Sequence, residues 1–296
     1  MSGLFCFGLS YTAAAYIERY GAQFGRIAGT VRNAEKAEQI AKNRIAGRAV
    51  DAFAFDDMRA AQALSDAALL IVSIPPDADG DIALRAYSEA LRQASALRSI
   101  IYLSTIGVYG DHAGAWVDET TMPNPKSVRS RERLTAELQW QDFGRAIGIP
   151  VAIFRLPGIY GPGRNALINV MRGEARRIVK PGQVFNRIHV HDIAQAIEAA
   201  YIRRADGIFN ICDDEPAPAQ APITYAADLL GAVLPAEVAF DDIKPTLSPM
   251  ALSFYAESKR ARNTRMKDEL GVRLLYPSYR EGLRALFEQG DAANLR

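Results

Sequence analysis

Short apolar runs alternate with longer segments of helical periodicity over the first 105 residues. Five of the runs are typical of β-strands, at residues 3–7, 24–32, 49–55, 67–74 and 99–104. Helical patterns fill the intervals, among them 33–43, 58–65 and 82–97. The run at 67–74 is apolar on both faces, as expected of a central strand in a parallel sheet. This alternation predicts an α/β fold built on a doubly wound parallel sheet.

The second half of the chain departs from this regular alternation. A long helix is predicted over 127–147, and strands are predicted over 150–155 and 207–212. Glycine and proline residues between 157 and 163 interrupt the pattern, and the region after 213 is rich in proline. We expect a dinucleotide-binding domain and a smaller C-terminal substrate lobe, with the boundaries 1–160 plus 187–212 and 161–186 plus 213–296.

Two further helices are predicted from the polar residues at which they begin. One starts in the segment 189–192, with His191 or Asp192 near its N-cap. The other covers 279–288, where the apolar positions recur on one face. We expect the second helix to pack on the C-terminal lobe.

Composition excludes some classes of partner. The 296 residues carry a formal net charge of +1 and are 49% hydrophobic, which gives no reason to expect nucleic acid or a membrane surface as a partner. No stretch reaches the roughly 18 apolar residues of a membrane span. The apolar N-terminal stretch lacks the basic start of a secretion signal. Cys6 and Cys212 both lie in apolar runs, so we expect buried thiols and a cytoplasmic location.

The turn after the first strand carries small residues at the positions of the dinucleotide fingerprint G-x-G-x-x-G. Gly8, Ser10 and Ala13 occupy these positions, with Leu9 and Tyr11 between them. The glycine permits a tight turn, and the small residues let backbone N–H groups approach a diphosphate at the start of the helix. The alternative is an ordinary turn between a strand and a helix. The position at the start of a βαβ unit favours a cofactor site.

Arg32 ends the second predicted strand. An acidic residue at this place normally accepts the ribose 2′-hydroxyl of NAD, whereas an arginine can pair with the 2′-phosphate of NADP. A hydrogen bond to a charged group contributes roughly 1.5–3 kcal/mol, which favours NADP about ten- to hundredfold. NADP is therefore the expected cofactor, and NAD stays possible. The alternative is a solvated arginine at the end of a strand.

Other residues follow the predicted strands at the same edge of the sheet, where α/β proteins bind their ligands. Asn33 and Asp56 follow the second and third strands, and Asp56 could instead cap the next helix. The candidates after the fourth strand are Ser73, Ile74 and Pro75. They are expected to form a wall against the cofactor ribose, although they could also be a simple turn at the end of the strand.

Several segments then resemble the motifs of one family, in the order in which that family carries them. Residues 103–110 (LSTIGVYG), 155–163 (RLPGIYGPG) and 188–194 (IHVHDIA) are similar to its S-T-x-x-V-Y-G, R-x-x-x-x-Y-G-P-G and H-V-x-D motifs. The end of the chain, from 258 to 283, resembles its terminal pattern. The chain resembles an extended or atypical short-chain dehydrogenase/reductase of the NAD-dependent epimerase/dehydratase type. The resemblance implies a Rossmann-like domain that binds NAD(P), with a small substrate lobe.

The catalytic pair of that family is missing. The family places Tyr-x-x-x-Lys on the long helix, where the lysine lowers the pKa of the tyrosine that transfers a proton. Alignment on Glu137 puts Arg133 at the lysine position and Arg129 at the tyrosine position. An arginine can hold a charge near the nicotinamide ribose, so Arg133 is a candidate cofactor contact, but it does not give up a proton.

Three residues are candidates for the altered catalytic role. Ser104 and Thr105 resemble the hydroxyls with which the family polarises its substrate. Tyr109 could replace the missing acid, or it could be a packed aromatic in the V-Y-G turn. Two functions follow: an oxidoreductase or epimerase/dehydratase-like enzyme with a non-standard acid, or a catalytically inactive NADP-binding sensor or scaffold.

Substrate contacts are expected from three further residues, Arg129, Trp116 and Arg260. Arg129 could bind an anionic group with two hydrogen bonds, or lie on a solvated helix face. The partner is expected to be a small molecule, and the long helix could also pair in a homodimer. The three histidines, at 112, 189 and 191, lack the spacing of a metal site, and no metal is expected.

Overall fold

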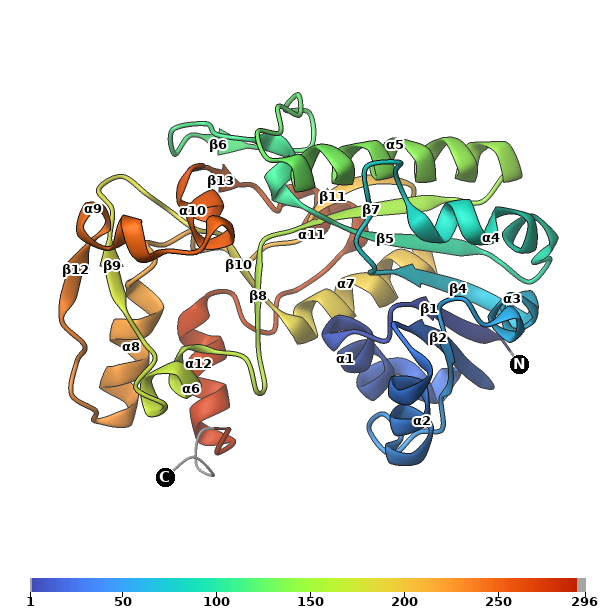
Figure 1. Cartoon of the computed structure of the whole chain (residues 1–296), viewed down its shortest axis with the longest axis horizontal. Helices are drawn as coiled ribbons and strands as arrows, with labels where there is room; N and C mark the ends of the chain where they lie inside the picture. Colours follow the sequence, from blue (N-terminus) through green and yellow to red (C-terminus); the bar gives the residue numbers. More distant parts are fainter. Residues whose placement is uncertain (1, 292–296) are drawn as a thin grey trace.

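A seven-stranded parallel sheet forms the centre of the protein, as the computed structural model of residues 2–291 shows (Figure 1). Its order is β11-β7-β5-β4-β1-β2-β3, so the order of the strands reverses between β1 and β4. This confirms the doubly wound sheet and all five strands predicted in the first 105 residues. The strands are β1 (Gly3–Phe7), β2 (Arg26–Val31), β3 (Asp51–Ala54), β4 (Ala67–Val72), β5 (Ser99–Thr105), β7 (Val151–Leu156) and β11 (Gly207–Asn210).

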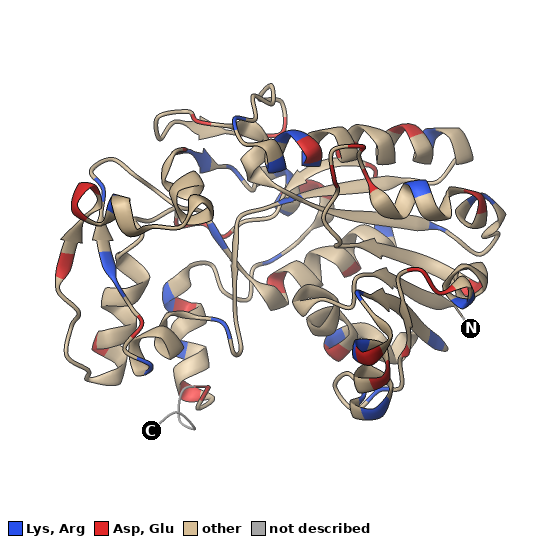
Figure 2. Ribbon diagram, viewed as in Figure 1, with Lys and Arg blue, Asp and Glu red and all other residues tan. Residues whose placement is uncertain are grey.

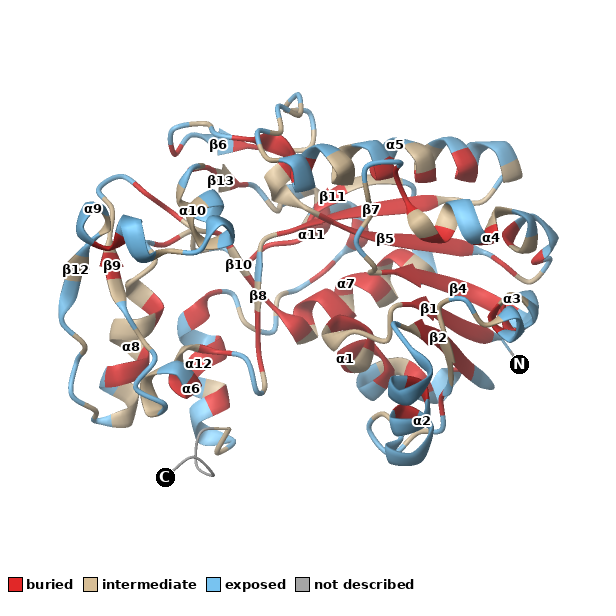
Figure 3. Ribbon diagram, in the orientation of Figure 1, coloured by how far each residue is buried: buried red, intermediate tan, exposed pale blue. Residues whose placement is uncertain are grey.

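Helices cover both faces of this sheet, because alternate strand residues point to opposite sides. Leu4 and Cys6 of β1 face α1 (Tyr11–Tyr20), α2 (Ala34–Asn43), α7 (Val190–Arg203) and α11 (Thr264–Leu270). Phe5 and Phe7 face α3 (Met58–Ala63), α4 (Ile82–Gln93) and α5 (Val128–Ile147). The central strands are buried, and the outer faces of the helices are exposed (Figure 3). The switch between β1 and β4 is where such sheets bind ligands.

A second hydrophobic core holds the smaller lobe, on the left of Figure 1. It is formed by α6 (Ala166–Met171), α8 (Ala221–Leu230) and α12 (Tyr279–Glu288). The predicted helix at 279–288 is therefore confirmed, and Tyr279, Leu283 and Leu286 are its buried face. The other elements of this lobe are β9 (Arg177–Val179), β12 (Glu237–Ala239), α9 (Phe240–Ile243) and α10 (Pro249–Tyr255).

Two short strand pairs connect the segments between the cores. β8 (Gly158–Tyr160) pairs with β10 (Arg187–His189), and β6 (Trp116–Val117) pairs with β13 (Arg260–Ala261). Four short 3₁₀ segments complete the described elements, at Gly21–Gln23, Leu64–Asp66, Ile106–Tyr109 and Lys244–Thr246.

The structure identifies the caps of two helices whose first residues the sequence left open. Asp57, and not Asp56, caps α3, because its carboxylate accepts the N–H of Arg59 at 2.9 Å. His189 caps α7, since its backbone is extended and its Nδ1 accepts the N–H of His191 at 3.1 Å. His191 and Asp192 lie near this cap, in the first turn of the helix, as expected. In both segments several polar residues stand side by side, and tertiary packing decides which one is the cap.

Asp192 connects the sheet domain to the chain that returns from the smaller lobe. Its two carboxylate oxygens accept the backbone N–H groups of Leu275 at 2.6 Å and Tyr276 at 3.2 Å. The side chain is fully buried, and burial raises the pKa of Asp192 to about 6. Burial acts in the opposite direction on His189, whose pKa falls to about 3 because its charged form is disfavoured.

These two groups predict opposite dependences of stability on pH. Neutral His189 loses stability as the pH falls from about 6.5 toward 3, because the unfolded state then binds a proton that the folded state does not. Asp192 gains stability as the pH falls from about 6 to about 4, because there the folded state binds the additional proton. Each contribution changes by about 1.4 kcal/mol per pH unit within its window.

Asp192→Asn is therefore expected to make the protein more sensitive to acid than the wild type between pH 6 and 4. His189→Asn keeps an N-cap acceptor but removes the titrating ring, so it should make the protein less sensitive below pH 6.5. Urea unfolding of both variants and the wild type across this range measures the difference. Parallel pH profiles for all three proteins would contradict the assignment.

The distribution of charges and the two thiols do not indicate a further functional site among the described residues. Basic and acidic residues are interspersed over both the sheet domain and the smaller lobe (Figure 2). Cys6 and Cys212 are buried free thiols, and burial raises the pKa of Cys6 to about 12. Within residues 2–291, no helix is long and apolar enough to cross a membrane.

Candidate functional site

The turn between β1 and α1 is held closely against the end of β4. Gly8 has φ +93°, and a Cβ on it would lie 2.6 Å from Ser73 Oγ and 3.0 Å from Ile74 Cγ2. Ser73 Oγ donates to the carbonyl oxygens of Phe7 at 3.2 Å and Gly8 at 3.0 Å. Glycine is therefore required at the first fingerprint position for both its conformation and its lack of a side chain.

Two backbone N–H groups at the start of α1 are free to bind a ligand. Leu9 and Ser10 donate their N–H groups to Thr30 and Gly8, while Ser10 Oγ accepts the N–H of Ala13 at 3.4 Å. The N–H groups of Tyr11 and Thr12 have no hydrogen-bond partner among residues 2–291. Ala13 is fully buried where α1 packs on the sheet. Free N–H groups at a helix N-terminus fit the diphosphate of a dinucleotide.

Arg32 and Asn33 follow β2 on the same side of the sheet. Arg32 is exposed, and its guanidinium makes no ion pair or hydrogen bond within the described part of the chain. Asn33 caps α2, since its Oδ1 accepts the N–H of Lys36 at 3.0 Å. Asp56 is also exposed, after β3. Of these three residues, Arg32 has the side chain with the chemistry for a phosphate.

Arg133 joins the ends of β4 and β5. Its Nη1 donates to Tyr102 Oη at 3.0 Å and to the carbonyl oxygens of Leu103 at 3.1 Å and Ile74 at 3.4 Å. Its Nε and Nη2 have no hydrogen-bond partner among residues 2–291. Arg133 is thus fixed at the carboxyl edge of the sheet, and its Nε and Nη2 donors are free to bind a ligand. Pro75, which follows Ile74, is exposed.

Ser104 belongs to a buried polar network beneath this edge. Its hydroxyl donates to Glu137, and Glu137 forms an ion pair with Arg155, with Nη2 and Oε2 2.7 Å apart. The side chains of Glu137 and Arg155 are each only 2% exposed. Because the Ser104 proton is committed to a buried carboxylate, this residue is better suited to position the site than to donate to a substrate.

Tyr109 packs against Arg155 of the same network. It is fully buried, its hydroxyl donates to Asn210 Oδ1 at 2.8 Å, and the Arg155 guanidinium lies 4.7 Å from its ring centre. Burial raises the pKa of Tyr109 to about 12, with Arg155 opposing the shift. This environment favours the packed-aromatic interpretation over a role as the missing acid, since a proton is harder to remove there.

Thr105 has the most suitable hydroxyl of the three catalytic candidates. Its Oγ1 accepts the N–H of Gly107 at 3.1 Å, so the oxygen is fixed while its own proton has no acceptor in the described chain. The side chain is half-buried at the carboxyl end of β5. A Cβ on Gly107 would lie 3.3 Å from this oxygen and 2.8 Å from Ser130 Oγ, which places a second hydroxyl close by.

The three expected substrate residues lie in different environments. Arg129 is exposed on the first turn of α5. Trp116 is 48% exposed, with the Arg262 guanidinium 5.0 Å from its ring centre. Arg260 donates to the carbonyl oxygen of Gly114, which connects β13 to the loop before β6 and supports a scaffold role. Trp116 and Arg260 lie side by side as register partners of β6 and β13, whereas no hydrogen bond or ion pair among residues 2–291 joins Arg129 to either of them.

The sequence alone did not predict the roles of four polar residues at this edge of the sheet. They are Tyr102, Glu137 (as the ion-pair partner of Arg155), Arg155 and Asn210. Arg155 carried a signal, because a charged residue within the apolar run 151–156 needs a buried counter-ion. The sequence identified Glu137 only as a motif position, and it indicated Tyr102 only as a residue of an apolar strand. Their pairing depends on how α5 packs on β5 and β7, which local sequence does not determine.

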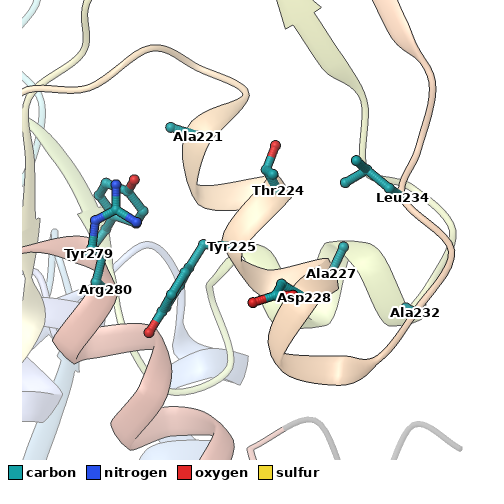
Figure 4. Close-up of a pocket in the computed structure, with 9 residues that line it drawn as sticks. All are labelled: Ala221, Thr224, Tyr225, Ala227, Asp228, Ala232, Leu234, Tyr279 and Arg280. Carbon is teal, nitrogen blue, oxygen red and sulfur yellow. The ribbon is translucent and has the colours of Figure 1, made fainter.

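Two open hollows lie away from this edge. One, of about 470 Å³, is between α8 and α12, and Tyr225, Asp228, Tyr279 and Arg280 line it (Figure 4). The other, of about 480 Å³, is lined by residues that include Asp214, Lys267 and Arg273. Neither includes a residue of the β1–α1 turn. Residues 2–291 contain no group of three or more His, Cys, Asp or Glu side chains arranged for a metal ion.

Comparison with known proteins agrees with the class that this geometry defines, a Rossmann-type α/β protein. The model of the NAD dependent epimerase/dehydratase family matches residues 78–212 of this chain. A solved structure of a functionally unknown conserved protein from Silicibacter pomeroyi DSS is 46% identical, with a TM-score of 0.88. The similarity covers 98% of this chain and 99% of that chain.

Two curated relatives match a part of the chain. Protein YeeZ of Escherichia coli (strain K12) is 35% identical over 158 residues, 51% of this chain and 54% of that protein. The 3-diazoavenalumate denitrifying reductase of a Streptomyces species is 29% identical over 142 residues, 44% of this chain and 45% of that protein. The chain thus spans about half the length of the curated relatives it matches.

Proposed function

We propose that this protein binds NADP in preference to NAD and is an oxidoreductase for a small carbonyl or alcohol substrate. The observation that carries the proposal is the combination of free N–H groups on Tyr11 and Thr12 with the unpaired guanidinium of Arg32. The first matches a diphosphate and the second a 2′-phosphate. The reductase named among the relatives supports the reaction class.

The residues of the β1–α1 turn would hold the diphosphate, and Ser73, Ile74 and Arg133 would line the ribose side. The nicotinamide, when bound, supplies or accepts a hydride. Thr105 is the group that would hydrogen-bond the substrate oxygen, since its hydroxyl proton is free. Ser104 and Glu137 would hold the end of β5 in place, so that Thr105 is presented in one orientation.

Thr105→Val tests the catalytic assignment, because it removes the hydroxyl but keeps the shape of the side chain. We expect about a 10²-fold lower kcat/KM, the order found for general acid–base groups, with an unchanged Kd for NADPH. The assay follows NADPH consumption with a panel of aldehydes, ketones and sugar nucleotides. Thr135→Val, at an exposed site on α5, is the matched control. Equal rates for the two variants would refute the role of Thr105.

The second candidate is an NADP-binding sensor without turnover. The observation that favours it is the arginine at both positions of the missing pair, Arg129 and Arg133, together with the buried Tyr109. NADPH binding with no consumption across the whole panel would support this function. Turnover that is lost in Thr105→Val would rule it out.

A further inference from the structure

The turn that follows β8 lies directly against the first residue of α1. Tyr11 Oη donates to the carbonyl oxygen of Pro162 at 3.0 Å. Gly161 and Arg164 close the turn with two backbone hydrogen bonds of 3.0 Å. The Arg164 guanidinium lies 6.0 Å from the centre of the Tyr11 ring. A segment 150 residues away in sequence is thus fixed beside the candidate diphosphate site.

The packing of this turn leaves little freedom. A Cβ on Gly161 would lie 2.7 Å from Tyr11 Oη and 2.8 Å from Val190 Cγ1, so the site accepts only glycine. The Asp291 carboxylate accepts the N–H of Gly163 at 3.1 Å and Nδ2 of Asn165 at 2.6 Å. The turn is therefore held on both sides, and its one nearby carboxylate is occupied by donors of the turn itself.

Two donors at this turn have no acceptor among residues 2–291. The exposed Arg164 guanidinium makes no ion pair or side-chain hydrogen bond. His189 is 1% exposed, and because its Nδ1 accepts the N–H of His191, its proton is on Nε2, which is unpartnered. That atom would lie 3.3 Å from a Cβ added to Gly161, and Tyr11 Oη would lie 2.7 Å from the same Cβ. Buried donors without partners are rare in folded proteins, so the Nε2 proton of His189 calls for an acceptor from outside the described residues.

We propose that Arg164 is a cofactor-binding residue that holds the diphosphate of the dinucleotide against the N-terminus of α1. This inference rests on the proposed function and extends it by one residue, which lies in the turn after β8 and not in the βαβ unit that starts the chain. The free N–H groups of Tyr11 and Thr12 bind one side of the diphosphate, and Arg164 binds it from the other. The Tyr11 ring and its bond to Pro162 position the arginine.

Arg164→Gln separates this role from that of Arg32. The diphosphate is common to NADPH and NADH, so we expect the variant to weaken both by about tenfold, the effect of losing a charge-assisted hydrogen bond. Adenosine 2′-monophosphate lacks the diphosphate, and its affinity should not change. Arg164→Lys keeps the charge and should recover part of the loss. Arg172→Gln, at an exposed arginine of the same segment, should leave all three affinities unchanged.

Isothermal titration of the full chain with the three nucleotides measures these affinities. A loss that is shared by NADPH and NADH and spares adenosine 2′-monophosphate would establish the role of Arg164. Unchanged affinities in Arg164→Gln, with normal binding by the wild type, would overturn the inference and leave the proposed function intact. Absence of any nucleotide binding by the wild type would instead overturn the proposed function, and the inference with it.

Discussion

Glu137→Gln is expected to lower the free energy of unfolding by about 3–5 kcal/mol, the range for breaking a buried ion pair. Arg155 is 2% exposed and has no other carboxylate within ion-pair distance in the described chain. The substitution keeps the shape of Glu137 but leaves the guanidinium charge buried without its counter-ion. The loss would be at least about a fifth of the roughly 5–15 kcal/mol that stabilises a typical domain.

Urea unfolding at neutral pH measures this change through the midpoint and slope of the transition. Glu38→Gln, at an exposed position on α2, is the matched control and should change stability by less than about 0.5 kcal/mol. The double variant Glu137→Leu with Arg155→Met removes both charges and should recover much of the stability. A loss below about 1 kcal/mol in Glu137→Gln would contradict the buried ion pair, since that is the value of an exposed pair.

The second large effect is expected for Arg32→Glu, which should weaken NADPH binding about hundredfold while changing NADH binding little. The reason is the loss of a charged hydrogen bond, worth roughly 1.5–3 kcal/mol, together with repulsion between the new carboxylate and the 2′-phosphate. A glutamate at this place can also accept the ribose 2′-hydroxyl of NADH, which should preserve or improve the affinity for that cofactor.

Arg98→Glu controls for the change of net charge. Arg98 is exposed just before β5, at the opposite edge of the sheet from Arg32. At physiological ionic strength, charges further apart than about 8 Å are largely screened, so this variant should bind both nucleotides as the wild type does. Equal weakening of NADPH and NADH by Arg32→Glu would show that Arg32 does not contact the 2′-phosphate.

The fold was predictable because its signals are local. The runs at 67–74 and 99–104 are too apolar to be anything but buried, and the turn at Gly8 lies where a βαβ unit requires it. The cap of α3 was predicted less well. Asp56 and Asp57 are adjacent carboxylates, and only the path of the chain after β3 shows that Asp57 accepts the N–H of Arg59.

The candidate site was predictable only in part, for a physical reason. Arg32 and the residues after each strand could be placed at one edge from the topology of the sheet alone. The hydrogen bond from Ser104 to Glu137 joins segments 33 residues apart, and the hydrogen bond from Tyr109 to Asn210 joins segments 101 residues apart. Both depend on how these segments pack together. The contact between Tyr11 and Pro162, which brings Arg164 to the turn, spans 151 residues. Sequence periodicity contains no information on such pairs.

The most direct test of the central claim is the affinity of the unmodified protein for NADPH and NADH, measured by nicotinamide fluorescence or calorimetry at one salt concentration. NADPH is expected to bind in the micromolar range and NADH at least about tenfold more weakly, the difference expected for one charge-assisted contact. No binding of either nucleotide, or tighter binding of NADH than of NADPH, would contradict it.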